Sequence, residues 1–134
     1  MTAALRKDHS VDRYGIDSYN AENRYRPCRR SGGVALFIKD SIEYYVREDL
    51  SIQNSYIESL FVEIEKESVC KNKNVICGVI YRPPDTDMKK FNEHLLDIVS
   101  SIKQEVKLSY LTGDYNINLL NIDSHNETHE FSDI

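Results

Sequence analysis

The chain has 134 residues, 40% of them hydrophobic, and a formal net charge of −5. This length suffices for one domain and is too short for two ordinary ones, and no apolar run is long enough to cross a bilayer. Three cysteines without a CxxC pair favour neither a disulfide framework nor a zinc site, and the first residues lack a signal-peptide pattern, so we expect an intracellular protein, nuclear or cytoplasmic.

The first half of the chain predicts strands. Residues 1–30 are polar, and we expect at most one short edge strand near residues 14–19. The compact apolar run at residues 34–38 predicts a buried strand, and the alternation over residues 42–46 predicts the second arm of a hairpin with it. Residues 57–65 predict another strand, with Leu60 and Val62 on one face and Phe61 and Glu63 on the other.

A basic cluster lies in the polar N-terminal stretch. It consists of Arg24, Arg26, Arg29 and Arg30. Such a cluster can bind phosphates. The alternative is a solvated loop, and the net charge of −5 argues weakly against nonspecific binding to nucleic acid.

A strand, a helix and a second strand follow. Residues 75–80 are apolar on both faces, as in a central strand, and two prolines at 83 and 84 end the run. Residues 87–104 predict a helix, capped by one of residues 85–87. Its apolar stripe comprises Phe91, Leu95, Leu96, Ile98, Val99 and Ile102. Residues 108–112 predict the second strand, and no further element is predicted after residue 118.

The tetrapeptide at residues 113–116 closes that second strand. In extended chain, Asp114 and Asn116 would project to the same side while Tyr115 turns toward the core. A carboxylate can orient or deprotonate a water, and an amide can hold an oxygen of the group under attack. The alternative is an ordinary turn, because Asp and Asn after Gly are common turn residues.

Tyr81 stands at a matching place upstream. A strand–helix–strand succession makes its two strands parallel, so both end at the same edge of the sheet. Tyr81 and Asp114 would then start about 5 to 10 Å apart, close enough to act on one phosphate group. The sequence therefore predicts one site at this edge.

The order of four segments carries a family resemblance. Ser-Gly-Gly-Val-Ala-Leu-Phe at 31–37, Glu-Ser-Leu-Phe-Val-Glu-Ile at 58–64, Tyr-Arg-Pro-Pro at 81–84 and Gly-Asp-Tyr-Asn at 113–116 resemble the endonuclease/exonuclease/phosphatase superfamily. More narrowly, they resemble the endonuclease domain of jockey-like non-LTR retrotransposons. The resemblance implies an α/β (α+β) fold, the central part of a four-layer α/β/β/α sandwich as in deoxyribonuclease I-like proteins, with one sheet largely present and the second incomplete.

The resemblance also implies a function and roles for residues. It implies magnesium-dependent hydrolysis of a phosphodiester, nicking target DNA to leave a 3′-hydroxyl that primes reverse transcription. Asp114 would orient and activate the attacking water, Asn116 would hold the phosphate, and Tyr81 would contact the scissile phosphate. Arg82 joins the basic cluster as a candidate contact to phosphate or DNA.

Several metal-binding groups of the family have no counterpart in the chain. An asparagine and a glutamate would precede residue 1, and an aspartate and a Ser-Asp-His motif would follow residue 134. We therefore expect residues 1–134 to be one partial domain, a truncated and inactive copy, whose uncovered sheet face favours self-association. A non-enzymatic relic or nucleic-acid-binding fragment, and a phosphatase of the same superfamily, remain alternatives.

Overall fold

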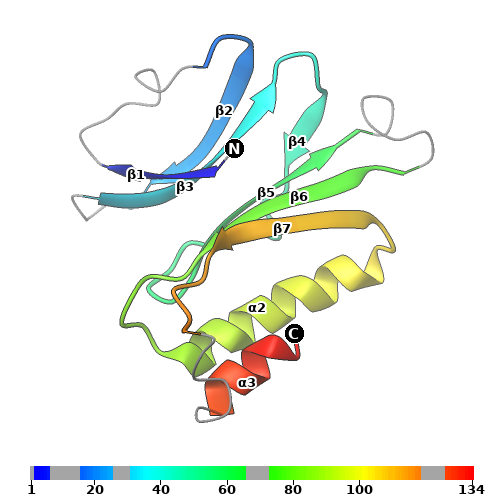
Figure 1. Cartoon of the computed structure of the whole chain (residues 1–134). Coiled ribbons are helices and arrows are strands. Elements are labelled where there is room, and N and C mark those ends of the chain that lie inside the picture. Colours follow the sequence, from blue (N-terminus) through cyan, green and yellow to red (C-terminus); the bar gives the residue numbers. More distant parts are fainter. Residues whose placement is uncertain (1, 7–15, 26–30, 66–72, 119–125) are drawn as a thin grey trace.

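The computed structural model describes residues 2–6, 16–25, 31–65, 73–118 and 126–134. In this part of the chain, seven strands form two sheets (Figure 1). Sheet A has the strand order β1-β3-β2, built from β1 (Thr2–Arg6), β3 (Ser31–Lys39) and β2 (Tyr19–Tyr25). Sheet B has the order β4-β5-β6-β7, built from β4 (Tyr44–Val46), β5 (Glu58–Ile64), β6 (Val75–Tyr81) and β7 (Leu108–Asp114). The helices are α2 (Met88–Gln104) and α3 (Asn126–Ser132), so the mixed α+β content agrees with the prediction. Helix α3 lies after residue 118, where no element was predicted.

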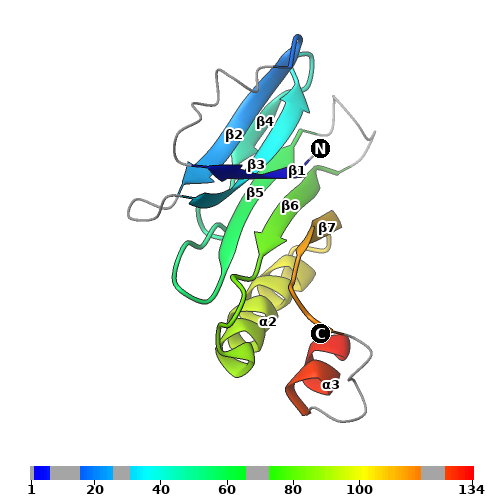
Figure 2. The ribbon, with the colours of Figure 1, turned by 60° about the vertical axis from the view of Figure 1, so that its left-hand side comes forward.

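The two sheets and the helices form successive layers, which the turned view also shows (Figure 2). One apolar core lies between the sheets and comprises Val34, Leu36, Ile38, Leu60, Val62 and Val79. A second core lies between sheet B and α2 and comprises Leu50, Ile57, Phe61, Ile76, Ile80, Phe91, Leu95, Ile98 and Ile102. Because side chains alternate along a strand, β5 and β6 supply both cores at once.

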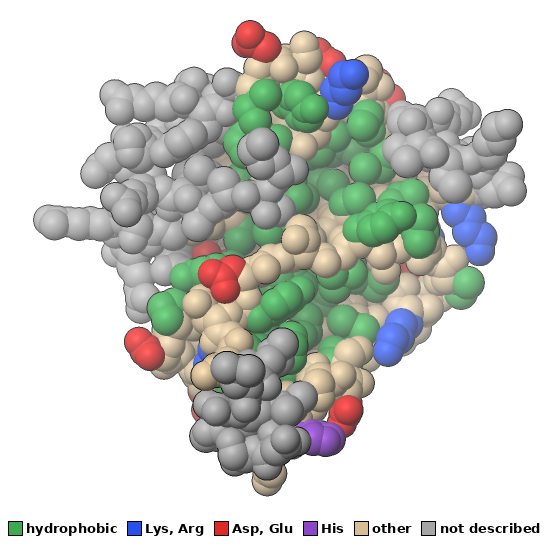
Figure 3. Space-filling view, in the orientation of Figure 1, with side chains coloured by type: hydrophobic (Ala, Val, Ile, Leu, Met, Phe, Trp, Pro, Cys, Tyr) green, Lys and Arg blue, Asp and Glu red, His purple; other side chains and the backbone are tan. Residues whose placement is uncertain are grey.

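Strands β6 and β7 are parallel and are joined through α2, as the sequence predicts. The remaining pairs of sheet B are antiparallel. Strand β7 is the outer strand of the sheet in the described part of the chain, and its Leu108 and Tyr110 are 52% and 61% exposed. Hydrophobic side chains gather across the middle of the face seen in Figure 3, over the strands. These exposed apolar groups are consistent with the predicted uncovered sheet face, whereas self-association itself stays a prediction.

Helix α2 begins after Asp87, whose Oδ1 accepts a hydrogen bond from the backbone N–H of Lys90 at 3.0 Å. This bond satisfies one of the N–H groups that have no partner within the first turn. Leu96 is 50% exposed, so the apolar stripe is narrower than predicted. Neither α2 nor α3, the helices that the structure describes, is long and apolar enough to span a membrane.

Two strand predictions are wrong. Residues 42–46 do not pair with β3; β4 joins the other sheet, where Tyr44 to Val46 pair with Ile64 to Val62 of β5. A turn closed by the bond from Ile42 N–H to the Lys39 carbonyl, at 3.0 Å, carries the chain from sheet A to sheet B. Residues 1–30, for which we expected at most one strand, contain two, β1 and β2. The strand expected at residues 14–19 begins only at Tyr19, since residues 17 and 18 form a turn and residues 14 and 15 lie outside the described part.

A cluster of charged side chains lies near the start of β7 and the end of α2, away from the ends of β6 and β7. Its centre is Glu63, whose side chain is 1% exposed and accepts bonds from Arg47 Nη1 at 2.7 Å and Lys107 Nζ at 2.7 Å. Both cations also bind Glu105, at 2.5 and 2.7 Å. Burial by itself raises the pKa of Glu63, but hydrogen bonds from Lys107, Asn74, Tyr45 and Arg47 outweigh it and lower that pKa to about 2.

Candidate functional site

Tyr81 and Asp114 are direct partners in the register of β6 and β7. Their strands also share a bond from Arg82 N–H to the Asp114 carbonyl at 2.9 Å. Neighbouring strands lie about 4.8 Å apart, and paired residues project to the same face. That face is the one toward sheet A, because Tyr81 packs against the core between the sheets. The predicted meeting of the two strand ends is confirmed, while the chemical roles of the two residues stay predictions.

Gly113 lets β7 lie close against β6 at this place. A Cβ there would lie 1.7 Å from the carbonyl oxygen of Ile80, its register partner on β6. Only a residue without a side chain can approach the neighbouring backbone so closely. The glycine of the tetrapeptide is therefore required by the packing of β7 on β6.

The backbone does not stay extended to Asn116, so that part of the prediction is wrong. β7 ends at Asp114, and Asn116 has a φ of 48°, in the left-handed region. Asp114 Oδ1 accepts a hydrogen bond from the backbone N–H of Asn116 at 3.0 Å. This is the turn that an Asp two residues before an Asn favours. Both side chains are exposed and belong to one short loop.

Tyr115 turns toward the helices, as predicted. Its ring lies 6.1 Å from that of Phe91 on α2 and 5.3 Å from that of Phe131 on α3. Burial raises the pKa of its hydroxyl. These aromatic contacts hold the loop against α2 and α3, while Asp114 and Asn116 stay at the surface.

Arg82 lies between the two strand ends, half-buried. Its Nη1 donates to the carbonyl of Asn116 at 2.9 Å, and its Nη2 donates to the carbonyl of Thr86 at 2.6 Å. The side-chain Nδ2 of Asn116 donates in turn to the carbonyl of Arg82 at 2.7 Å. These contacts bind the loop after β6 to the loop after β7.

Glu58 is a residue of the site that sequence reasoning did not single out. It is the register partner of Tyr81 on β5 and is 1% exposed. Glu58, Tyr81 and Asp114 thus stand side by side across three strands, on one face. The alternation of β5 carried the signal, because Glu58 has the same parity as Leu60 and Val62, which face sheet A.

Arg24, the member of the predicted basic cluster that lies among the described residues, does not join this site. Arg24, on β2, pairs with Glu48, which follows β4 at the other edge of sheet B from β7. Arg26, Arg29 and Arg30 lie outside the described residues. A contact from this cluster to DNA stays a prediction.

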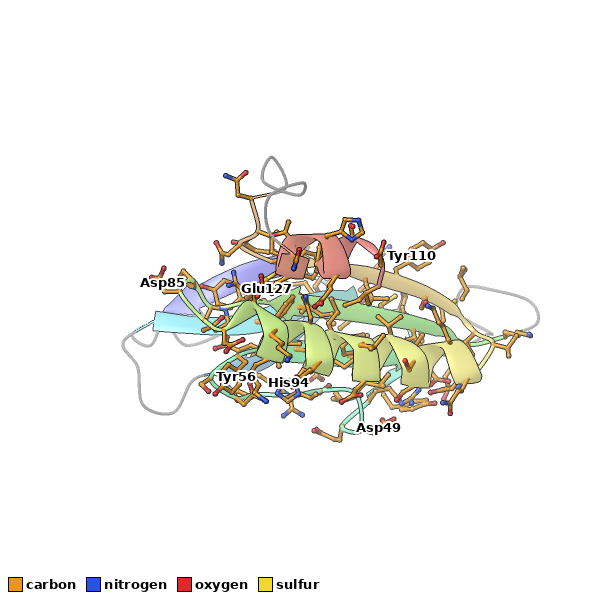
Figure 4. The ribbon with its side chains drawn as sticks, turned by 90° about the horizontal axis from the view of Figure 1, so that it is seen from below. Asp49, Tyr56, Asp85, His94, Tyr110 and Glu127 are labelled. Atoms are coloured by element: carbon orange, nitrogen blue, oxygen red, sulfur yellow. The ribbon has the colours of Figure 1, made fainter. Side chains whose placement is uncertain are left out.

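Two pockets border the loop that carries Asp114. The larger, of about 630 Å³, is lined by residues 113–118 and Phe131. The smaller, of about 200 Å³, lies between this loop and the helices and includes Arg82, Met88, Glu127 and Thr128 in its lining. Figure 4 shows Asp85 and Glu127 near the N-terminal end of α2, and Tyr110 of β7 toward the other end of the helix.

The described residues do not form a preassembled metal site. Among them, no three His, Cys, Asp or Glu side chains gather closely enough to hold a metal ion. Magnesium is commonly bound by one or two carboxylates completed by water and substrate phosphate. At this edge, Asp114 is an exposed carboxylate and Glu58 is a buried one. The donor set falls short of a full site, so magnesium stays an expectation from the resemblance.

Comparison of the chain with protein-family models, with curated proteins and with solved structures finds no match. The site is therefore characterised by its own geometry: a phenol, a carboxylate and a carboxamide at the shared end of two parallel strands, with a buried acid beside the phenol.

Proposed function

We propose that this chain is part of an endonuclease domain of the endonuclease/exonuclease/phosphatase superfamily, of the retrotransposon kind, that hydrolyses a phosphodiester of DNA. The observation that supports it best is the register pairing of Tyr81 with Asp114, with Asn116 two residues on. Sites of α/β sheets commonly lie at the carboxyl ends of parallel strands, which is where these groups stand. The two facing sheets with helices outside sheet B are compatible with the central part of a four-layer sandwich.

In the proposed reaction, Asp114 binds the attacking water. Its carboxylate is exposed and already accepts the N–H of Asn116, which orients it. Water attacks phosphorus as the bond from phosphorus to the 3′ oxygen breaks, and Asp114 takes the proton of the attacking water. The leaving oxygen takes a proton from solvent water to become the 3′-hydroxyl, and Asp114 returns its proton to solvent. An aspartate is a weak base at neutral pH, so positioning has to supply much of the rate.

Tyr81 and Asn116 would hold the phosphate in this reaction. The Tyr81 hydroxyl can donate to a non-bridging oxygen on which negative charge develops. The amide of Asn116 carries two N–H groups, of which one is donated to the Arg82 carbonyl. The other can donate to the phosphate without breaking that bond. In the family, magnesium when bound supplies further charge stabilisation and activates the water.

A nicking assay tests the proposal. Purified chain is incubated with supercoiled plasmid and magnesium, beside Asp114→Ala and the control Asp97→Ala, an exposed acid on α2. If the chain retains activity in spite of the truncation expected above, it and the Asp97 variant convert plasmid to the nicked circle, and Asp114→Ala loses about a hundredfold or more of that rate. Equal background rates for all three proteins would reject the enzyme. Salt-dependent DNA binding without cleavage would instead establish a nucleic-acid-binding fragment.

A further inference from the structure

The loops that leave β6 and β7 are bound to each other reciprocally. Arg82 Nη1 donates to the carbonyl of Asn116 at 2.9 Å, and Asn116 Nδ2 donates to the carbonyl of Arg82 at 2.7 Å. The backbone N–H of Arg82 also donates to the carbonyl of Asp114 at 2.9 Å. Three hydrogen bonds therefore join residues 32 to 34 positions apart in the sequence, at the end of the sheet where the site lies.

A second guanidinium nitrogen of Arg82 also binds within the loop after β6. Nη2 donates to the carbonyl of Thr86 at 2.6 Å, and the hydroxyl of Thr86 donates to the carbonyl of Pro83 at 2.8 Å. The Nε atom is buried and meets no acceptor in the described part of the chain. A guanidinium presents its N–H groups in a rigid fork, which suits two carbonyls on two different loops.

The contacts from Arg82 hold Asn116 in an uncommon backbone conformation. Its φ of 48° lies in the left-handed region, which few residues with a Cβ adopt, although Asn adopts it more readily than most. Its backbone N–H binds Oδ1 of Asp114 at 3.0 Å, so its position fixes the rotamer of the carboxylate. The contacts thus run from Arg82 to Asn116 and from Asn116 to Asp114.

We propose that Arg82 is a positioning residue, which holds Asn116 and through it the Asp114 carboxylate in the geometry that the reaction needs. This inference rests on the proposed function for its effect on rate. Arg82 donates to carbonyls of the protein through Nη1 and Nη2, whereas a contact to DNA would use the N–H groups of the guanidinium that these two bonds leave over. The two roles predict opposite behaviour of charge-conserving variants.

The first test measures the loop directly and needs no activity. Nitrogen-15 relaxation is recorded for the backbone amide of Asn116 in the chain, in Arg82→Met and in the control Lys103→Met, an exposed cation at the far end of α2. We expect the order parameter to fall from about 0.85 to below about 0.6 in Arg82→Met and to stay unchanged in the control. Unchanged order in Arg82→Met would overturn the proposal.

The second test separates positioning from phosphate binding. A single ammonium cannot bind the carbonyls of Asn116 and Thr86 at once, so Arg82→Lys should lose about tenfold or more in kcat, as Arg82→Met should. KM and the salt dependence of DNA binding should stay unchanged in both variants. The double variant Arg82→Met with Asn116→Ala should be no slower than Asn116→Ala alone. If Arg82 instead contacts phosphate, Arg82→Lys should retain affinity, and Arg82→Met should lower the salt slope by about one.

The two readouts distinguish the inference from the function on which it rests. If the unaltered chain does not nick DNA while Asn116 loses order in Arg82→Met, the proposed function fails. The role of Arg82 in holding the two loops together is then still supported. If the chain nicks DNA and Arg82→Met keeps both its loop order and its kcat, the positioning role fails and the proposed function stands.

Discussion

Glu63 is the residue whose replacement we expect to alter stability most through charge. Lowering its pKa from 4.5 to about 2 corresponds to about 3 kcal/mol of folding free energy at neutral pH. Its side chain is 1% exposed, so solvent screens these interactions little. In Glu63→Gln, Arg47 and Lys107 keep Glu105 but lose their shared buried carboxylate. We therefore expect Glu63→Gln to lower the free energy of unfolding by about 3 kcal/mol at pH 7.

The pH dependence makes this prediction specific. The pKa of Glu63 is lower in the folded than in the unfolded chain, so its stabilisation is complete above about pH 5 and is lost as pH falls toward 2. At pH 3, about half of the 3 kcal/mol remains, because the folded carboxylate is still largely ionised while the unfolded one is protonated. The difference between the chain and Glu63→Gln should therefore narrow to about 1.5 kcal/mol at pH 3.

Urea unfolding followed by far-ultraviolet circular dichroism at several pH values measures this difference. Glu93→Gln is the control, since its carboxylate is 51% exposed and pairs with Lys90 on the surface of α2. We expect that variant to change stability by less than about 0.5 kcal/mol. A loss below about 1 kcal/mol for Glu63→Gln at pH 7, or a loss that stays constant down to pH 3, would refute the reasoning.

Two further predictions concern the elements that bear the site. Gly113→Ala should lower the free energy of unfolding by about 3 kcal/mol or more, because its Cβ would overlap the Ile80 carbonyl. A melting temperature like that of the unaltered chain would contradict the close approach of β7 to β6. Asp87→Ala should cost about 1 kcal/mol through the lost cap of α2, and Asp87→Asn, which keeps an oxygen acceptor, should restore most of it in the same denaturant assay.

The elements that local pattern determines were predictable. The stripe at Phe91, Leu95, Ile98 and Ile102 and the cap at Asp87 define α2, because both belong to contiguous sequence. The register of Tyr81 with Asp114 followed from the parallel strands that a strand–helix–strand unit imposes. In both cases a general rule of chain geometry leaves few alternatives.

Choices between distant partners were not predictable in the same way. The alternation at residues 42–46 indicates a strand with one buried face and does not say which sheet receives it. Helix α3 is only seven residues long, so its stability depends on packing, here of Phe131 against Tyr115 and Phe91, rather than on its own sequence. The pairing of Glu58 with Tyr81 likewise depends on where β5 sits in the sheet.

The loop after β7 shows why a turn and a site need not be alternatives. The bond from Asn116 N–H to Asp114 Oδ1 is an ordinary turn interaction. It also orients the exposed carboxylate of Asp114, the register partner of Tyr81. Tyr115, between them, is fixed by aromatic contacts to both helices. Tyr115 is half-buried against the helices, whereas Asp114 and Asn116 on either side of it are exposed. The placement of the polar groups thus accompanies the packing of the residue between them.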